Sequence, residues 1–229
     1  MSRNPRPRVL IMGACTGVGR ACAEALDRQG AELILSDHDG PALQALSTSL
    51  GAVSRFCDIV SETSVDIFAA EIRSNFETLD VLINAAGTGF ERTLGMYRVS
   101  NALLPALRNN PGRTFIFNVP PGEQPSAADI FPYAGSRQAF LRLCEVLADE
   151  LRGSPVSVRV ACQQRLQIGT VQAAADVEDY GSAGAEGPVQ DNAAALATRI
   201  ASLIFFSDAS DRRRTLMSPP RVERKVGRG

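Results

Sequence analysis

The sequence Gly13-Ala14-Cys15-Thr16-Gly17-Val18-Gly19 decides the fold, because its three glycines fall between an apolar run and a segment with helical spacing. The apolar run covers residues 9–12 and the helical spacing covers residues 21–28. Glycines allow a tight turn and a close approach of the backbone to a ligand, and a helix N-terminus favours a diphosphate group. The pattern predicts a phosphate-binding turn between a first strand and a first helix.

An acidic residue, Asp37, closes the next apolar run, 18 residues after the last glycine of the loop. At this position of a dinucleotide-binding unit, a carboxylate accepts a hydrogen bond from the 2′-hydroxyl of the adenosine ribose. Its charge repels a 2′-phosphate, and neither Thr16 nor His38 offers a fixed positive charge in compensation. We therefore expect NAD rather than NADP. The alternative is that Asp37 is a turn residue at the strand end, since Asp39-Gly40 follows.

Short apolar runs alternate with helix-like segments along most of the chain. The expected strands cover residues 9–12, 32–36, 53–56, 81–83, 113–119 and 156–161, and the expected helices cover residues 21–28, 41–50, 61–75, 133–152 and 189–205. This alternation is typical of a parallel sheet with helices on both faces. We expect an α/β fold, a Rossmann-like doubly wound parallel sheet that forms a single domain over residues 9–211, with a mobile loop at residues 172–187.

The basic residues are almost all arginine. Of 24 lysines and arginines in 229 residues, only Lys225 is a lysine, and His38 is the one histidine. A Gly-Lys-Ser/Thr phosphate loop is therefore excluded, and so is a Schiff-base lysine in the body of the chain. Ser-His-Asp catalysis and multi-histidine metal sites would all have to use His38, so we expect no metal site.

Positive charge is concentrated at the two ends of the chain. Residues 1–8 carry three arginines and no acid, and residues 212–229 carry a net charge of +6, although the whole chain has a net charge of -1. We interpret both ends as solvated basic tails. The alternative is a polyanion-binding role anchored on Arg212-Arg213-Arg214. No aromatic residues lie there to stack on bases, so nucleic acid is not an expected partner.

The five cysteines are scattered and include no Cys-x-x-Cys pair, which is typical of a reducing compartment. No apolar run approaches the roughly 18 residues of a membrane span, and no signal-peptide core is evident near the N-terminus. We expect a cytoplasmic protein without a membrane segment. Cys15 lies beside a helix N-terminus, which can favour a redox-sensing thiolate, but we interpret it as a small loop residue.

Several ordered motifs resemble those of the short-chain dehydrogenase/reductase family over roughly residues 8–210. The glycine loop resembles the family's TGxxxGxG sequence, with Met12 in place of the threonine. Cys57-Asp58-Ile59 resembles the segment whose acid holds the adenine amino group. Asn84-Ala85-Ala86-Gly87 resembles the NNAG motif after the fourth strand, and Tyr133-Ala134-Gly135-Ser136-Arg137 lies where the family has its YxxxK motif.

This resemblance implies a set of cofactor-binding residues and a catalytic pair. The implied cofactor-binding residues are Gly13, Cys15, Thr16, Gly17, Val18, Gly19, Asp37, Asp58, Ile59, Asn84, Ala85, Ala86, Gly87, Tyr133, Arg137 and Thr170. The implied catalytic residues are Tyr133, which exchanges a proton with the substrate, and Arg137, which stands in place of the family's lysine.

The sequence departs from the family on the substrate side. Arg137 keeps the positive charge that favours a tyrosinate, but its planar fork is not a compact ammonium. Pro121 aligns with the serine that orients the substrate carbonyl, and proline has neither a hydroxyl nor an N–H. Arg165-Leu166 replaces a Pro-Gly beside the nicotinamide. The segment between Asn84 and Pro121 is also shorter than is usual in the family.

Two functions are consistent with this pattern. The first is an oxidoreductase that transfers hydride between NAD(H) and a small-molecule carbonyl or alcohol, with reduced or specialised activity and as a homo-oligomer. The alternative is a non-catalytic dinucleotide-binding or scaffold relative that acts through oligomer or partner contacts.

Overall fold

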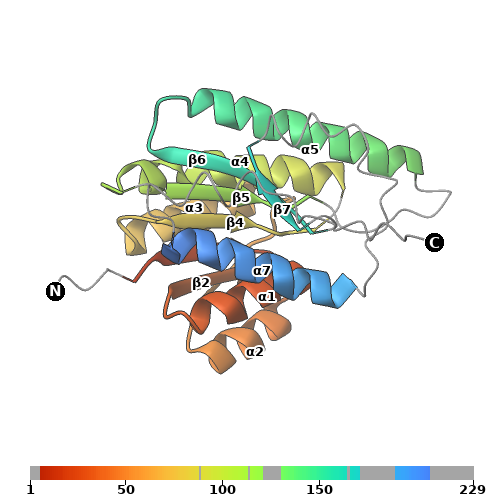
Figure 1. The fold of residues 1–229 in the computed structure, drawn as a ribbon. Coiled ribbons are helices and arrows are strands. Elements are labelled where there is room, and N and C mark those ends of the chain that lie inside the picture. The colour runs from red at the N-terminus through yellow and green to blue at the C-terminus, as the bar shows by residue number, and fades with distance from the viewer. Residues whose placement is uncertain are drawn as a thin grey trace, which may run out of the picture.

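The computed structural model of the chain describes residues 6–87, 89–112, 114–120, 130–163, 166–170 and 189–206. A seven-stranded sheet in the order β3-β2-β1-β4-β5-β6-β7 lies between two layers of helices (Figure 1). The strands are β1 (Arg8–Met12), β2 (Glu32–Asp37), β3 (Val53–Phe56), β4 (Val81–Asn84), β5 (Thr114–Asn118), β6 (Val156–Cys162) and β7 (Gln167–Gly169). The helices are α1 (Gly17–Asp27), α2 (Gly40–Leu50), α3 (Glu62–Asn75), α4 (Phe90–Arg108), α5 (Ile130–Glu150) and α7 (Val189–Phe206). The expected doubly wound single domain is confirmed.

Different helices cover the two faces of the sheet. Helices α1, α2 and α7 pack on one face, and α3, α4 and α5 pack on the other (Figure 1). Along β1, Val9 and Ile11 pack in the core beneath α1, α2 and α7, whereas Leu10 and Met12 pack in the core beneath α3, α4 and α5. Successive side chains of a strand point to opposite faces, so each strand contributes to both cores. Burial on both faces explains why the strands read as continuous apolar runs.

The strand order reverses at β1, which lies between β2 and β4. All neighbours from β3 to β6 are parallel, and β7 adds an antiparallel edge next to β6 that the sequence pattern did not predict. At the carboxyl end of β1, Met12 is aligned with Ser36 of β2 and with Asn84 of β4. Ligands of doubly wound sheets bind at this end, in the crevice where the order reverses.

Side-chain caps explain where three of the helices begin. Thr16, Asp39 and Ser61 are the N-cap residues of α1, α2 and α3, and each accepts a hydrogen bond from a backbone N–H in the first turn. The predicted cap at Ser61 is confirmed. Helix α1 begins at Gly17, four residues before the expected start, so the last two glycines of the loop belong to its first turn.

Helix α4 is the longest element that the sequence pattern did not predict. Its buried residues include Thr93, Gly95 and Ser100, which dilute the apolar spacing expected of a packed helix. A Cβ atom at Gly95 would lie 2.1 Å from the carbonyl oxygen of Ile59, so only glycine allows α4 to pack this closely on the turn after β3. The first turn of α4 is thereby held next to the carboxyl ends of the strands.

The ends of the chain are described only in part. Arg8, which the charge pattern placed in the N-terminal tail, is the first residue of β1 and pairs with Glu32 at 3.0 Å. The C-terminal tail and the loop expected at residues 172–187 lie outside the described residues. Within the described ranges, no helix combines the length and the apolar character needed to cross a membrane.

Candidate functional site

The glycine-rich loop is shaped by close contacts between backbone segments. Gly13 has a φ of 74°, and a Cβ atom there would lie 2.5 Å from the Ala85 carbonyl oxygen and from the Ala86 Cα atom. A Cβ atom at Gly19 would lie 2.0 Å from the Gly13 carbonyl oxygen. In contrast, a Cβ atom at Gly17 would have no heavy atom of the described residues within 4 Å, apart from its chain neighbours and its own helix backbone. Gly13 and Gly19 are thus required by the fold, whereas the N-terminus of α1 at Gly17 faces open space.

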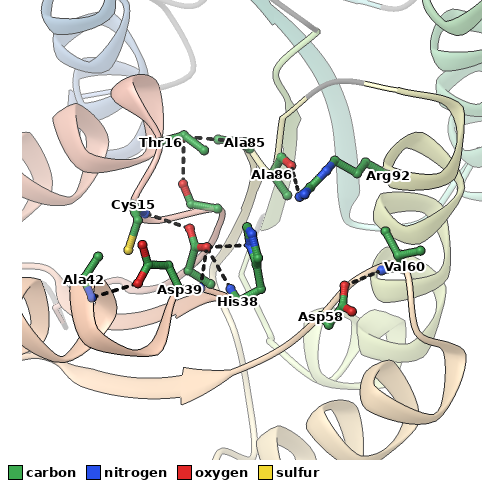
Figure 2. Close-up of polar contacts among 12 residues, drawn as sticks. Cys15, Thr16, His38, Asp39, Ala42, Asp58, Val60, Ala85, Ala86 and Arg92 are labelled. Carbon is green, nitrogen blue, oxygen red and sulfur yellow. Dashed lines mark hydrogen bonds and ion pairs between the residues drawn. The ribbon is translucent and has the colours of Figure 1, made fainter.

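Thr16 uses its hydroxyl group to hold the loop. The hydroxyl accepts a hydrogen bond from the Gly19 N–H at 3.1 Å and donates toward the carbonyl oxygens of Gly13, at 2.8 Å, and Ala85, at 3.1 Å. Figure 2 shows the contact between Thr16 and Ala85, which joins the loop to the turn after β4. The Thr16 side chain therefore fixes the position of the loop.

Asp37 lies at the end of β2 with only 5% of its surface exposed. Its Oδ2 atom accepts a hydrogen bond from the Cys15 N–H at 2.9 Å. Its Oδ1 atom accepts from the backbone N–H groups of His38, at 2.7 Å, and Asp39, at 3.2 Å, and lies 2.9 Å from the His38 Nδ1 atom. Asp37 therefore acts as a turn residue, and its carboxylate also lines the pocket described below.

The segments after β3 and β4 complete the site. Cys57 and Ile59 face the site, whereas Asp58 accepts a hydrogen bond from the Val60 N–H at 3.1 Å and is not among the pocket-lining residues (Figure 2). Asn84 is fully buried, and its Nδ2 atom donates to Ser100 Oγ at 2.9 Å and to Asn118 Oδ1 at 2.8 Å. Asn84 therefore ties β4 to α4 and β5.

These segments enclose a pocket of about 260 Å³ at the carboxyl ends of β1 to β4. It is lined by Met12, Gly13, Thr16, Asp37, His38, Cys57, Ile59, Ala86, Gly87 and Arg92. Whole ligand sites have volumes of about 300–1,000 Å³, so this pocket accommodates part of a dinucleotide, such as its adenosine portion. The residues present fit such a group, because the open N-terminus of α1 lies next to the loop and Asp37 offers an acceptor inside the pocket.

Arg92 is a pocket residue that the sequence analysis missed. It lies in the first turn of α4, and its Nη1 atom donates to the Ala86 carbonyl oxygen at 3.2 Å (Figure 2). The sequence analysis considered only Thr16 and His38 as sources of positive charge in this pocket, and Arg92 adds one that it did not consider. One signal was available in the sequence, namely a cation shortly after the turn that follows β4.

The predicted catalytic residues belong to α5, and none of the described residues of α5 lines this pocket. Tyr133 is in the first turn of α5, and its side chain lies outside the described part of the structure. Arg137, one turn further along α5, is half-buried, and Thr170 is exposed just after β7. Pro121 and Arg165 lie outside the described residues. Of the residues implied by the resemblance, the structure thus brings those of the loop and of the ends of β2, β3 and β4 together.

The Cys15 thiol does not have the properties of a redox-sensing thiolate. Burial, together with the negative charges of Asp37 and Asp39, raises the pKa of Cys15 to about 11. Burial raises the pKa of Cys22 to about 12 and that of Cys57 to about 11. These thiols stay protonated at neutral pH, which agrees with the interpretation of Cys15 as a small loop residue.

A pocket at the reversal point of a doubly wound sheet, beside an open helix N-terminus, defines a nucleotide-binding α/β protein. The sequence matches the family described as short chain dehydrogenase over residues 7–178. The chain therefore belongs to the short-chain dehydrogenase/reductase family.

Two curated relatives place the chain within this family. L-fucose dehydrogenase of Oryctolagus cuniculus is 29% identical over 173 residues, which cover 67% of this chain and 60% of that enzyme. The 3-oxoacyl-[acyl-carrier-protein] reductase of Escherichia coli is 25% identical over 213 residues, which cover 82% of this chain and 87% of that enzyme. The chain thus matches less than two thirds of the first enzyme's length and most of the second's.

Solved structures share the fold at lower sequence identity. An actinorhodin polyketide ketoreductase variant with NADPH has a TM-score of 0.67 at 20% identity, over 89% of this chain and 92% of that one. A short-chain dehydrogenase/reductase from Burkholderia phymatum in complex with NAD has a TM-score of 0.65 at 23% identity, over 94% and 88% of the two chains. At these identities the likeness concerns the fold.

Proposed function

We propose that this protein is an NAD(H)-dependent oxidoreductase that transfers hydride between its cofactor and a carbonyl or alcohol group of a small molecule. The observation that carries this proposal is the buried Asp37 carboxylate in the wall of the pocket. A free ribose 2′-hydroxyl can donate to this carboxylate, whereas a 2′-phosphate would be repelled by it. The names of the two curated relatives, a sugar dehydrogenase and a ketoacyl reductase, support a carbonyl or alcohol substrate.

The chain's own residues would move the proton. When bound, a nicotinamide cofactor would supply or accept the hydride. During reduction, the Tyr133 phenol would give its proton to the substrate oxygen as the carbonyl carbon receives the hydride; during oxidation, Tyr133 would take the proton back as the hydride returns to the cofactor. Arg137 follows four residues later on α5, so it lies on the same helix face and its positive charge favours the tyrosinate form.

We propose that the activity is reduced or specialised because of Pro121. Proline at the position of the family's serine cannot donate a hydrogen bond to a developing oxyanion. Loss of one such donor typically lowers the rate by about 10²–10³. The substrate carbonyl would then have to be polarised mainly by Tyr133.

Thermal unfolding with NAD, NADH, NADP and NADPH, together with absorbance assays on a panel of carbonyls and alcohols, tests the proposal. We expect NAD(H) to raise the unfolding temperature more than NADP(H), and turnover to be measurable. Stabilisation by NAD(H) without any turnover would support the non-catalytic alternative, and no stabilisation by any of the four would contradict both.

A matched pair of tyrosine variants tests the assignment of the catalytic residue. Tyr133→Phe should abolish turnover while NADH still binds, because phenylalanine removes only the hydroxyl group. Tyr97→Phe is the control, because the Tyr97 hydroxyl donates to Glu150 at 3.2 Å, at the other end of α5 from Tyr133, and it should keep full turnover. Equal activity of both variants would refute the assignment.

The homo-oligomer stays a prediction, which light scattering on the purified protein can test.

A further inference from the structure

Arg92 occupies a position that does not favour helix stability. It is the third residue of α4, and the N-cap Gly89 provides no side-chain cap. The N-terminus of a helix carries a partial positive charge, so a cation in the first turn is unfavourable there. Arg92 therefore does not stabilise α4, and its position is better explained by the pocket that its side chain lines.

The packing of α4 directs Arg92 into the nucleotide pocket. Gly95 holds the helix against Ile59, and Arg92 lies three residues earlier, on the same helix face. The Arg92 side chain passes Gly87, where a Cβ atom would lie 3.8 Å from Arg92 Cδ, and its Nη1 atom reaches the Ala86 carbonyl oxygen. Figure 2 shows the guanidinium directed from α4 toward Ala86, across the pocket from the glycine loop.

The guanidinium of Arg92 contacts a neutral group, unlike several other arginines of the chain. Arginines 8, 55, 98, 142 and 152 each pair with a carboxylate. Within the described residues, no carboxylate lies within 4.0 Å of Arg92, and its one hydrogen bond goes to the Ala86 carbonyl. A guanidinium has five N–H donors in a planar fork, so most of them stay available to a ligand.

The charges that line the pocket lie on opposite walls. Asp37 stands at the end of β2, and Arg92 reaches in from α4, where it is the one lining residue with a permanent positive charge among those described. The loop from Gly13 to Gly19 holds no basic residue, so the loop offers a diphosphate only backbone N–H groups and the partial charge of α1. A planar guanidinium matches two phosphate oxygens at once.

We propose that Arg92 binds the diphosphate of the dinucleotide from the α4 side of the pocket, opposite the glycine loop. This inference rests on the proposed cofactor site but not on hydride transfer. It assigns different roles to the two charged walls: Asp37 selects the ribose without a 2′-phosphate, and Arg92 strengthens the binding of every ligand that carries the diphosphate. The short connection from β4 to α4, residues 85–89, is what brings this arginine to the pocket.

Calorimetric titration of the full chain with NADH, NADPH, ADP-ribose and adenosine tests the proposal. Arg92→Gln should weaken binding of the three diphosphate ligands by a similar factor, about ten- to hundredfold, because a hydrogen bond to a charged group is lost. Its adenosine affinity should stay within about twofold of the wild type. Arg92→Lys, which keeps the charge but not the fork, should show a smaller loss.

Arg98→Gln is the matched control, because Arg98 lies on the same helix, is not a pocket residue and pairs with Glu62 at 3.8 Å. It should bind all four ligands like the wild type. An equal loss of adenosine binding in Arg92→Gln would overturn the proposal in favour of stacking on adenine, and a loss confined to NADPH would overturn it in favour of a 2′-phosphate contact. Unchanged binding would overturn it outright. If the wild type binds no diphosphate ligand, the proposed function itself fails, which is a separate and recognisable result.

Discussion

The two halves of the carboxyl edge of the sheet differ in how well their residues fit the roles expected for cofactor binding and for catalysis. Around β1 to β4, backbone contacts of Gly13 and Gly19, the buried Asp37 and the Asn84 network form a closely fitted pocket. After β5 and in α5, we propose that Pro121 stands at the position of the family's serine and Arg137 at that of its lysine. We therefore predict that nucleotide binding and hydride transfer are separable in this protein. Changes in the first half should alter folding and affinity, and changes in the second should alter turnover.

The largest expected effect comes from the loop glycines. Gly13→Ala and Gly19→Ala force a Cβ atom to within 2.5 Å and 2.0 Å of backbone atoms, so each should destabilise the fold by about 3 kcal/mol or more. Gly17→Ala is the control with open space at the Cβ position, and it should change stability by less than about 1 kcal/mol. Urea unfolding measures all three. A stable Gly13→Ala protein would contradict the close approach of the loop to the turn after β4.

A gain of activity is the next largest effect. Pro121→Ser should raise kcat by about 10²-fold, because it restores a hydroxyl donor at the position where the family orients the substrate carbonyl. NADH affinity should not change, since this residue belongs to the half that we assign to turnover. Steady-state kinetics on the best substrate of the panel, with calorimetry for NADH, measures both. A change in NADH affinity without a change in kcat would contradict the prediction that the segment after β5 affects turnover and not cofactor binding.

A smaller effect is expected at the ribose end of the pocket. Asp37→Asn should weaken NADH binding about tenfold and shift the NADPH-to-NADH affinity ratio toward NADPH, because the repulsive charge is removed. Asp39→Asn is the control: Asp39 caps α2 by accepting from the Ala42 N–H at 3.1 Å, and asparagine caps a helix as well as aspartate. The control should leave the ratio unchanged, and an equal shift in both variants would show that general charge decides the preference.

The smallest effect concerns Cys15. Cys15→Ser should leave NADH affinity within about twofold, because serine keeps the backbone N–H that donates to Asp37. Because the pKa of the thiol is raised to about 11, its alkylation should accelerate by about tenfold per pH unit from pH 7 toward that value. Mass spectrometry of alkylated peptides measures the rate. A plateau below pH 8 would mean that the thiol ionises far more easily than its surroundings imply.

Most of the fold could be predicted because local signals agree with each other. Ser61 before a helical run, the glycines after residues 9–12 and continuous apolar strands each predict one element that the structure contains. Helix α4 was missed because Thr93 and Ser100 are buried in it and weaken its apolar spacing. Strand β7 has only three residues, too few for a pattern of period two to be recognised.

The candidate site was predictable only where a residue's role follows from its place in the chain. Asp37 was found because the end of the second strand always faces the same edge of such a sheet. Arg92 was missed because its direction depends on the packing of Gly95 against Ile59, a contact between segments more than thirty residues apart in the chain.

The most direct test of the separation between binding and turnover is calorimetric titration of NADH into the wild type, Gly17→Ala and Tyr133→Phe. We expect one saturable site per chain in the wild type, and saturable binding also in Tyr133→Phe, which loses only a hydroxyl group. Gly17→Ala should be folded but bind at least about tenfold more weakly, because its new Cβ atom fills the space through which the backbone approaches the diphosphate. The absence of saturable binding in the wild type, or equal binding in Gly17→Ala, would contradict the assignment of this pocket to the cofactor.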